Sequence, residues 1–249
     1  MKVWKGKANE AMRCGQVAAD PAKHIIEILM VSGGFAFAVI YLLWFLLCGT
    51  QQSMYRRSLK ERKRWTRLMM ETPTNNIFGV QATRNEIMVV GGIMEFSFSL
   101  VAILVSVTIA VDVSCMLRRL DDRDPILKSH QSYIDPHNKL RALGALLLMS
   151  YACAFLSLQM LQSLTPMVSM TSTPVAQEAA EHVVQKTTRA HSLYAFALRF
   201  LLLAIPVILW FFGPTWYLVG SIGMTFFMAA SDYVSPQAFG PTESSYREL

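Results

Sequence analysis

The stretch HSLYAFALRFLLLAIPVILWFFGP, residues 191–214, combines an apolar run with a single permanent cation, Arg199. It belongs to a longer apolar segment, residues 193–231, which exceeds the roughly 20 residues that one membrane crossing needs. Gly213-Pro214 divides that segment, so we predict two crossings joined by a tight turn. The alternative is one long helix that is kinked at Pro206.

The rest of the chain has the composition of a membrane protein. Only 16% of the 249 residues are charged, against about a quarter in soluble domains, so solvent-facing side chains are scarce. Three further apolar stretches cover residues 28–48, 87–111 and 142–164. Lipid offers backbone groups no hydrogen-bond partner, so these stretches should be helical. We therefore predict an all-α, polytopic transmembrane helical bundle with five spans, or four if the last is long and kinked.

The spans lie in one central domain. We expect a transmembrane helical domain over residues 25–232, an N-terminal segment 1–24 that is a surface helix or disordered, and a disordered tail 233–249. Two glycine pairs, Gly33-Gly34 and Gly91-Gly92, predict sites where another helix approaches closely. The protein is then a multi-pass membrane protein, and a plasma membrane or endomembrane is favoured.

The polar residues outside the spans exclude several functional classes. The net charge of +6 comes from Lys and Arg in loops beside the spans, where they anchor helices, so nucleic acid is not expected as a partner. The cysteines have no metal-ligand spacing, and neither have three connector residues, namely His130, Asp135 and His137. No H-E-x-x-H or G-x-S-x-G motif occurs, so we expect no enzyme, no cofactor and no metal.

A strongly basic stretch follows the first span. Between residues 56 and 67 there are seven cations and one acid, Glu61, beside apolar residues such as Leu59 and Trp65. We predict a helix in the membrane interface whose basic flank faces anionic lipid headgroups; the alternative is a solvated charged loop. The cations are Arg56, Arg57, Lys60, Arg62, Lys63, Arg64 and Arg67.

The membrane orientation follows only from charge density. In the five-span arrangement each side of the membrane carries 11 Lys and Arg residues, so the count is tied. The dense basic cluster after the first span favours a cytosolic location for that connector.

Ionisable residues within membrane spans are rare and usually paired. Counted from the connectors that share one face, Glu95, Arg199 and Gln159 each lie about 8–12 Å inside their spans. We therefore predict that Arg199 pairs with Glu95 and that Gln159 adds hydrogen bonds. Arg84 lies about three helical turns before Glu95 and is expected to join this buried polar layer, with Asn85 and Gln81 at its mouth.

Two functional interpretations of this layer remain open. In the first, the layer holds the helices together, and the protein is a non-enzymatic scaffold or accessory membrane component. In the second, it is a hydrated cavity in a small oligomeric channel or transporter. The expected partners are the lipid bilayer, anionic headgroups, and a homo-oligomer or another membrane protein.

Three stretches together show a resemblance to a known family. KRWTRLMM (63–70), VQATRNEIMVVGG (80–92) and FALRFLLLAIPVILWFFGP (196–214) resemble domain of unknown function 599, a family of small membrane proteins of bacteria and plants. The matching positions are Arg62, Trp65, Arg84, Asn85, Leu198, Arg199, Pro206, Trp210, Gly213 and Pro214, whereas Ala197 stands where the family often has glycine. The resemblance covers about residues 44–232. It implies the span layout and no activity.

Overall fold

The computed structural model describes residues 21–47, 54–71, 76–110, 124, 126, 134–169 and 176–232. These residues form helices and contain no strand, which confirms the all-α fold class for this part of the chain. The elements are α2 (Pro21–Leu47), α3 (Met54–Glu71), α4 (Asn76–Ala110), α6 (Pro136–Ser169), α7 (Ala176–Leu209), the 3-10 turn η2 (Trp210–Phe212) and α8 (Pro214–Asp232).

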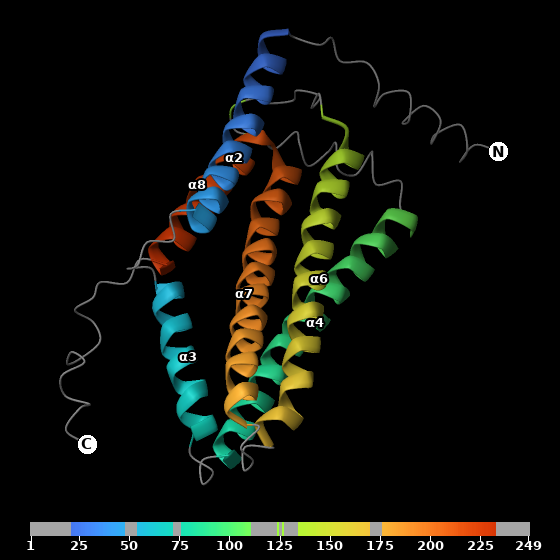
Figure 1. The fold of residues 1–249 in the computed structure, drawn as a ribbon. Coiled ribbons are helices and arrows are strands. Elements are labelled where there is room, and N and C mark those ends of the chain that lie inside the picture. The colour runs from blue at the N-terminus through green and yellow to red at the C-terminus, as the bar shows by residue number, and fades with distance from the viewer. Residues whose placement is uncertain are drawn as a thin grey trace.

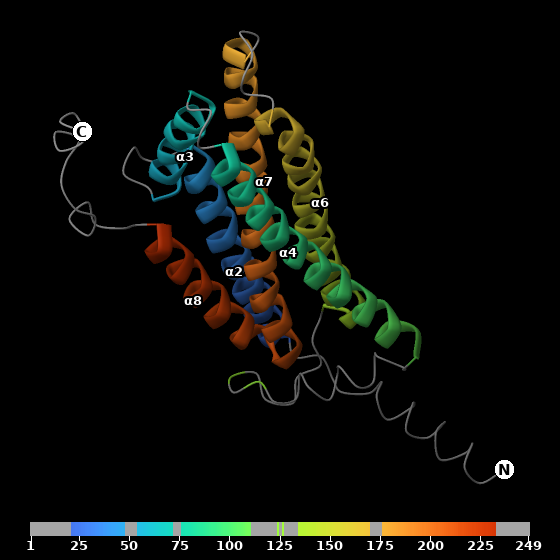
Figure 2. The same ribbon diagram turned by 90° about the horizontal axis from the view of Figure 1, so that it is seen from below.

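The long helix α6 stands between α4 and α7 and contacts both (Figure 1). On the other side of α7, α8 packs against α7 and α2, and the two helices α2 and α8 run side by side (Figures 1 and 2). Helix α3 continues from below α2 and lies along the lower part of α7. One edge of the bundle is therefore formed by the single helix α4, and the other edge is formed by the α2–α8 pair.

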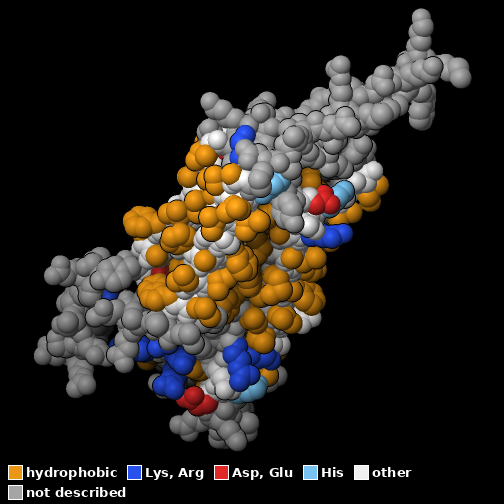
Figure 3. Space-filling model, turned by 90° about the horizontal axis from the view of Figure 1, so that it is seen from above, with side chains coloured by type: hydrophobic (Ala, Val, Ile, Leu, Met, Phe, Trp, Pro, Cys, Tyr) orange, Lys and Arg blue, Asp and Glu red, His pale blue; other side chains and the backbone are white. Residues whose placement is uncertain are grey.

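Within the described part of the chain, four helices are long and apolar enough to cross a membrane: they cover Ala22–Phe45, Ile77–Ile109, Pro136–Met167 and Ala180–Phe212. This supports a multi-pass membrane protein, and it does not confirm the predicted count of five spans. The predicted break is present, because α7 ends at Leu209 and α8 starts at Pro214. Apolar side chains cover most of the middle of the molecular face in Figure 3, as lipid contact requires.

Buried serines connect the three long helices. The Ser97 and Ser150 hydroxyls lie 3.1 Å apart, and Ser150 donates to the Ala197 carbonyl at 2.8 Å. Further along the same seam, Ser157 donates to the Ala190 carbonyl at 2.7 Å. All three hydroxyl-bearing side chains are fully buried, so each small polar residue both permits close helix packing and adds a hydrogen bond.

The two glycine pairs have different surroundings. A Cβ added at Gly34 would lie 2.6 Å from the Tyr217 ring, so the close approach of α2 and α8 depends on this glycine. At Gly91 and Gly92 an added Cβ would meet nothing within 4 Å. The first pair is therefore a packing site as predicted, whereas the second faces open space on α4.

Two predicted segments lie mostly outside the described residues. Helix α2 begins at Pro21, so the last four residues of the predicted 1–24 segment belong to a helix. The surface helix or disorder expected before it, and the disorder expected for the tail 233–249, concern residues that the structure does not describe.

Candidate functional site

The Arg199 side chain is bound to the last residue of α8. Its Nη2 donates to both carboxylate oxygens of Asp232, at 2.7 and 2.9 Å. The Tyr41 hydroxyl donates to Asp232 at 2.7 Å and accepts from Arg199 Nε at 3.2 Å. The remaining terminal nitrogen, Nη1, donates to the Ala195 carbonyl at 3.0 Å. Each guanidinium nitrogen therefore has an acceptor within the bundle.

Aromatic rings enclose the same guanidinium. Its carbon lies 3.6 Å from the centre of the Phe45 ring and 5.8 Å from that of Tyr55. Tyr55 in turn donates from its hydroxyl to Ser192 on α7 at 2.7 Å. Arg199 and Asp232 are only 11% and 10% exposed, and the cation–π contacts are strongest when the cation is desolvated. One cation thus joins α2, α3, α7 and α8.

The predicted pairing of Arg199 with Glu95 is wrong. Glu95 is exposed on α4 and makes no side-chain hydrogen bond or ion pair among the described residues. The two residues nevertheless lie at similar levels, since the Ser97–Ser150–Ala197 connection puts Glu95 and Arg199 about 6 Å apart along the bundle axis. The direction differs, because Arg199 faces α8 and Glu95 faces away from the bundle.

The other members of the predicted buried layer are also exposed. Gln159 and Arg84 are exposed, and Asn85, which is also exposed, lines a separate cavity at Arg62. Ser157 is level with Ala190, so Gln159 lies about 16 Å from Arg199 along the axis rather than beside it. The structure therefore does not bring these five residues together into one buried layer.

The sequence held a usable signal for the true partner. The turn at Gly213-Pro214 folds α8 back along α7, so residues well after the turn must return to the level of residues well before it. Asp232 is the first charged residue after that turn. The sequence analysis does not use it, because it follows directly on the uncharged end of the segment 193–231.

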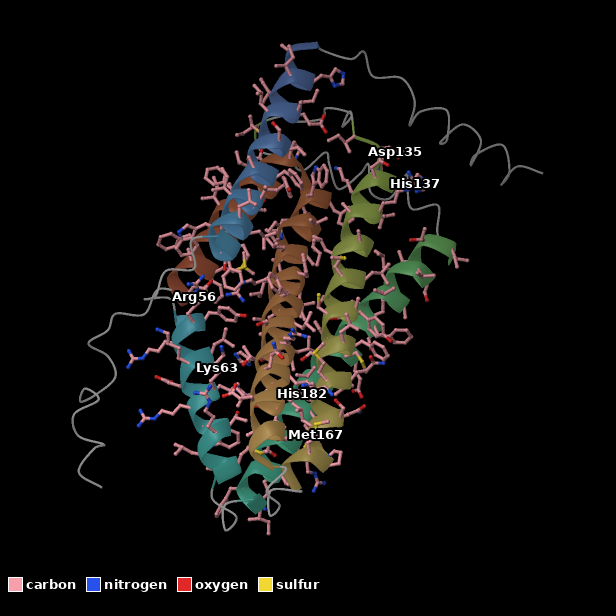
Figure 4. All side chains as sticks on the ribbon, in the orientation of Figure 1. Arg56, Lys63, Asp135, His137, Met167 and His182 are labelled. Carbon is pink, nitrogen blue, oxygen red and sulfur yellow. The ribbon has the colours of Figure 1, made fainter. Side chains whose placement is uncertain are left out.

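The predicted basic helix is present as α3. Six of its seven cations are exposed, among them Arg56 and Lys63, which Figure 4 labels on α3. Arg62 differs, because it points inward and forms an ion pair with Glu86 on α4. Partial burial lowers the pKa of Arg62 below the usual range for a guanidinium, and nearby Tyr194 acts in the opposite sense. The side chain stays cationic at neutral pH.

The Arg62–Glu86 pair borders a cavity of about 240 Å³ between α3, α4, α6 and α7. Its polar wall also includes Asn85, Ser157, His191 and Tyr194, and its apolar wall includes Val89, Val90 and Leu161. The His191 ring stands between two tyrosines, with ring centres 6.3 Å from Tyr55 and 5.9 Å from Tyr194. The sequence predicts Arg62 as part of the basic flank that faces lipid headgroups, whereas the structure places it at this cavity.

A larger cavity, of about 610 Å³, lies between α2, α6, α7 and α8. Its lining is mainly aliphatic and aromatic and includes Phe35, Leu146 and Val207, with no charged residue among those that line it. Such a surface suits hydrocarbon rather than an ion or a polar solute. It therefore gives no support to a polar conduction path through the described bundle.

The connector residues considered as metal ligands belong to a helix start. Asp135 accepts a hydrogen bond from the His137 backbone N–H at 3.1 Å, and both residues lie at the beginning of α6 (Figure 4). This is an N-terminal cap of a helix. His130 lies outside the described residues, and among those described no group of three or more His, Cys, Asp or Glu could hold a metal ion.

Comparison with known proteins gives one match. A family model described as "Protein of unknown function, DUF599" matches residues 29–237. No curated protein matches the chain, and no solved structure does. The match covers every described helix at least in part and confirms the resemblance seen in the sequence. The description of the family assigns it no activity.

Proposed function

The chain belongs to the DUF599 family of proteins of unknown function, and we propose that it is a non-enzymatic membrane scaffold or accessory component. In this proposal its bundle presents the outer face of α4 to another membrane helix. The contacts of Arg199 support a structural role for this cation, since its guanidinium is bound by Asp232 and Tyr41 and lines neither of the two cavities. A channel or transporter is expected to use a buried polar layer of five residues. The described helices do not bring these residues together, so we do not pursue that alternative.

One observation carries the proposal: an exposed carboxylate in a membrane-spanning helix. Glu95 lies within the candidate span Ile77–Ile109, and its side chain is not covered by the rest of the bundle. An ionisable group on the lipid-facing side of a span costs several kcal/mol, on the order of 2.5–3.5 by insertion scales, unless it is paired. A partner that covers Glu95 would remove this cost.

The residues around Glu95 are shaped for a helix. Gly92, Ser99, Ala102 and Ser106 share its exposed face at alternating spacings of three and four residues. This is the period of a helix–helix seam, and small side chains let two backbones approach closely. The face of α4 that carries Glu95 therefore fits a membrane helix with an Arg, Lys or hydrogen-bond donor opposite the carboxylate.

Site-specific photocrosslinking in native membranes tests this partner. With a benzoylphenylalanine at Ser99, we expect a discrete adduct that falls about tenfold or more in Glu95→Leu, because truncating one member of a buried charge pair costs 2–5 kcal/mol. A probe at Phe226, which is 75% exposed on α8, is the matched control and should crosslink only to lipid.

The identity of the adduct decides between partners. The crosslinked helix should carry a polar or basic residue whose replacement also removes the adduct. An adduct between two copies of the 28.0 kDa chain would make the complex a homo-oligomer. An adduct that is indifferent to Glu95, or a partner helix without a polar side chain, would contradict the proposal.

We also propose that α8 is the fifth crossing. Its 19 residues extend about 28 Å, close to the roughly 30 Å of the hydrocarbon core, and it packs along α2 and α7. Epitope tags placed before residue 21 and after residue 232 should then be accessible from opposite sides of the membrane in selectively permeabilised cells. Tags accessible from the same side would leave four crossings and exclude this topology.

The outer face of α3 supports the predicted contact with anionic headgroups. Six of its cations are exposed, although Arg67 is paired with Glu181 on α7, and each basic residue near an anionic surface contributes about 1 kcal/mol of attraction. This contact is non-specific and sensitive to salt.

A further inference from the structure

The cavity at Arg62 offers a ligand both signs of charge. Arg62 comes from α3 and Glu86 from α4, so the two charges stand on different helices at one wall of the 240 Å³ space. Both side chains keep partial exposure, 23% for Arg62 and 29% for Glu86, and can therefore be reached by a bound group. A simple anion would be attracted by Arg62 and repelled by Glu86, and a simple cation the reverse.

A zwitterion matches this wall. Its phosphate or carboxylate can accept hydrogen bonds from the Arg62 guanidinium, while its ammonium group lies against Glu86. The rings of His191 and Tyr194 also line the cavity, and a tyrosine face attracts an ammonium cation. The amide of Asn85 adds a further hydrogen-bonding group.

The size and position of the cavity favour a headgroup. Its volume of about 240 Å³ is below the roughly 300–1,000 Å³ of pockets that enclose a drug-sized molecule. On α4, Asn85 and Glu86 precede Val89 and Val90 by one turn, so the polar wall lies nearer the start of the span and the apolar wall deeper in it. A phospholipid headgroup with its glycerol end toward Val89 follows the same gradient.

We propose that this cavity binds a zwitterionic group with an ammonium and a phosphate or carboxylate, as found in a phosphatidylethanolamine headgroup or a small free zwitterion. Arg62 binds the anionic end and Glu86 the ammonium end. The site is distinct from the proposed contact of α4 at Glu95, because Glu95 is not among the residues that line the cavity.

Native mass spectrometry of the purified full-length chain tests the site. We expect phosphatidylethanolamine to bind with an affinity at least about tenfold higher than phosphatidylglycerol, which has the phosphate without an ammonium group. Competition by free phosphoethanolamine would identify the small zwitterion as a sufficient ligand, and its failure to compete would assign the site to the lipid. Binding to the exposed cations of α3 should persist in Val89→Trp, so the comparison is made on the binding that this variant loses. A preference of that binding for phosphatidylglycerol, or equal binding of both lipids there, would overturn the proposal.

Paired variants locate the binding. Glu86→Gln should remove the preference for phosphatidylethanolamine, whereas Lys63→Gln, an exposed cation on α3, should keep it. Val89→Trp tests the site without touching the ion pair, since Val89 is 55% exposed at the cavity and a larger ring can occlude it. Its control is Val105→Trp, at a 50% exposed position elsewhere on α4. Binding that survives both Glu86→Gln and Val89→Trp would refute the site.

Discussion

Asp232→Ala is expected to destabilise the bundle by about 3–5 kcal/mol, because it leaves a largely buried cation without its carboxylate. The Arg199 guanidinium is 11% exposed and has Asp232 as its only carboxylate partner among the described residues. Tyr41 also loses the acceptor of its 2.7 Å hydrogen bond. The measurement is the free energy of unfolding in mixed micelles titrated with a denaturing detergent.

Three further variants separate the loss of the Arg199–Asp232 pair from other effects on stability. Asp232→Asn should lower the free energy of unfolding by less than Asp232→Ala does, since asparagine keeps an acceptor for Tyr41 and Arg199 without the charge. The double variant Arg199→Leu with Asp232→Leu should recover part of the loss, since neither charge is left alone. Glu95→Ala should leave the stability of the isolated chain unchanged within about 0.5 kcal/mol. A larger loss of stability for Glu95→Ala than for Asp232→Ala would contradict Asp232 as the stabilising partner of Arg199.

The helices and the similar levels of Glu95 and Arg199 could be predicted, because both follow from counting residues along the chain. An apolar run of a given length must form a helix in lipid, and each residue adds about 1.5 Å of depth. The interruption at Gly213-Pro214 likewise follows from local backbone chemistry and appears at that position. Glu95 and Arg199 accordingly lie at similar levels.

The direction of each side chain could not be predicted in the same way. A residue's direction on a helix depends on which neighbours that helix meets, and the sequence did not show that α7 packs against α8 while α4 stands at the edge. Two intramembrane charges of opposite sign therefore suggested a pair. The actual partner, Asp232, lay just beyond the apolar stretch that had been used to define the last span.

The inward direction of Arg62 had a signal that was not used. Leu59, Thr66 and Met70 are three, four and eight residues away from Arg62, which is the spacing of one helix face. Thr66 and Met70 are buried against the bundle, so a cation on their face must point inward and find an acid. Charge counting treated the seven cations of α3 as equivalent, whereas helical phase separates one from the other six.

Gly213→Ala is expected to destabilise the protein by about 2–4 kcal/mol, from backbone strain and from a steric clash together. Gly213 has φ +130° and ψ 161°, a region that residues with a Cβ essentially do not adopt. An added Cβ would also lie 2.7 Å from the Asp124 Cβ, and Asp124 is 3% exposed and has little room to move.

The clash also disturbs the start of α8. Asp124 accepts hydrogen bonds from the Thr215 backbone N–H at 3.1 Å and the Thr215 hydroxyl at 2.8 Å, so displacing it removes the cap of that helix. Gly223→Ala is the matched control on α8, because an added Cβ there meets nothing within 4 Å and alanine favours a helix interior by about 1 kcal/mol. Thermal unfolding followed by size-exclusion chromatography should rank Gly223→Ala at or above the parent chain and Gly213→Ala clearly below it. Equal melting temperatures for the two variants would mean that the α7–α8 turn tolerates a side chain, and the return of Asp232 to Arg199 would then need another explanation.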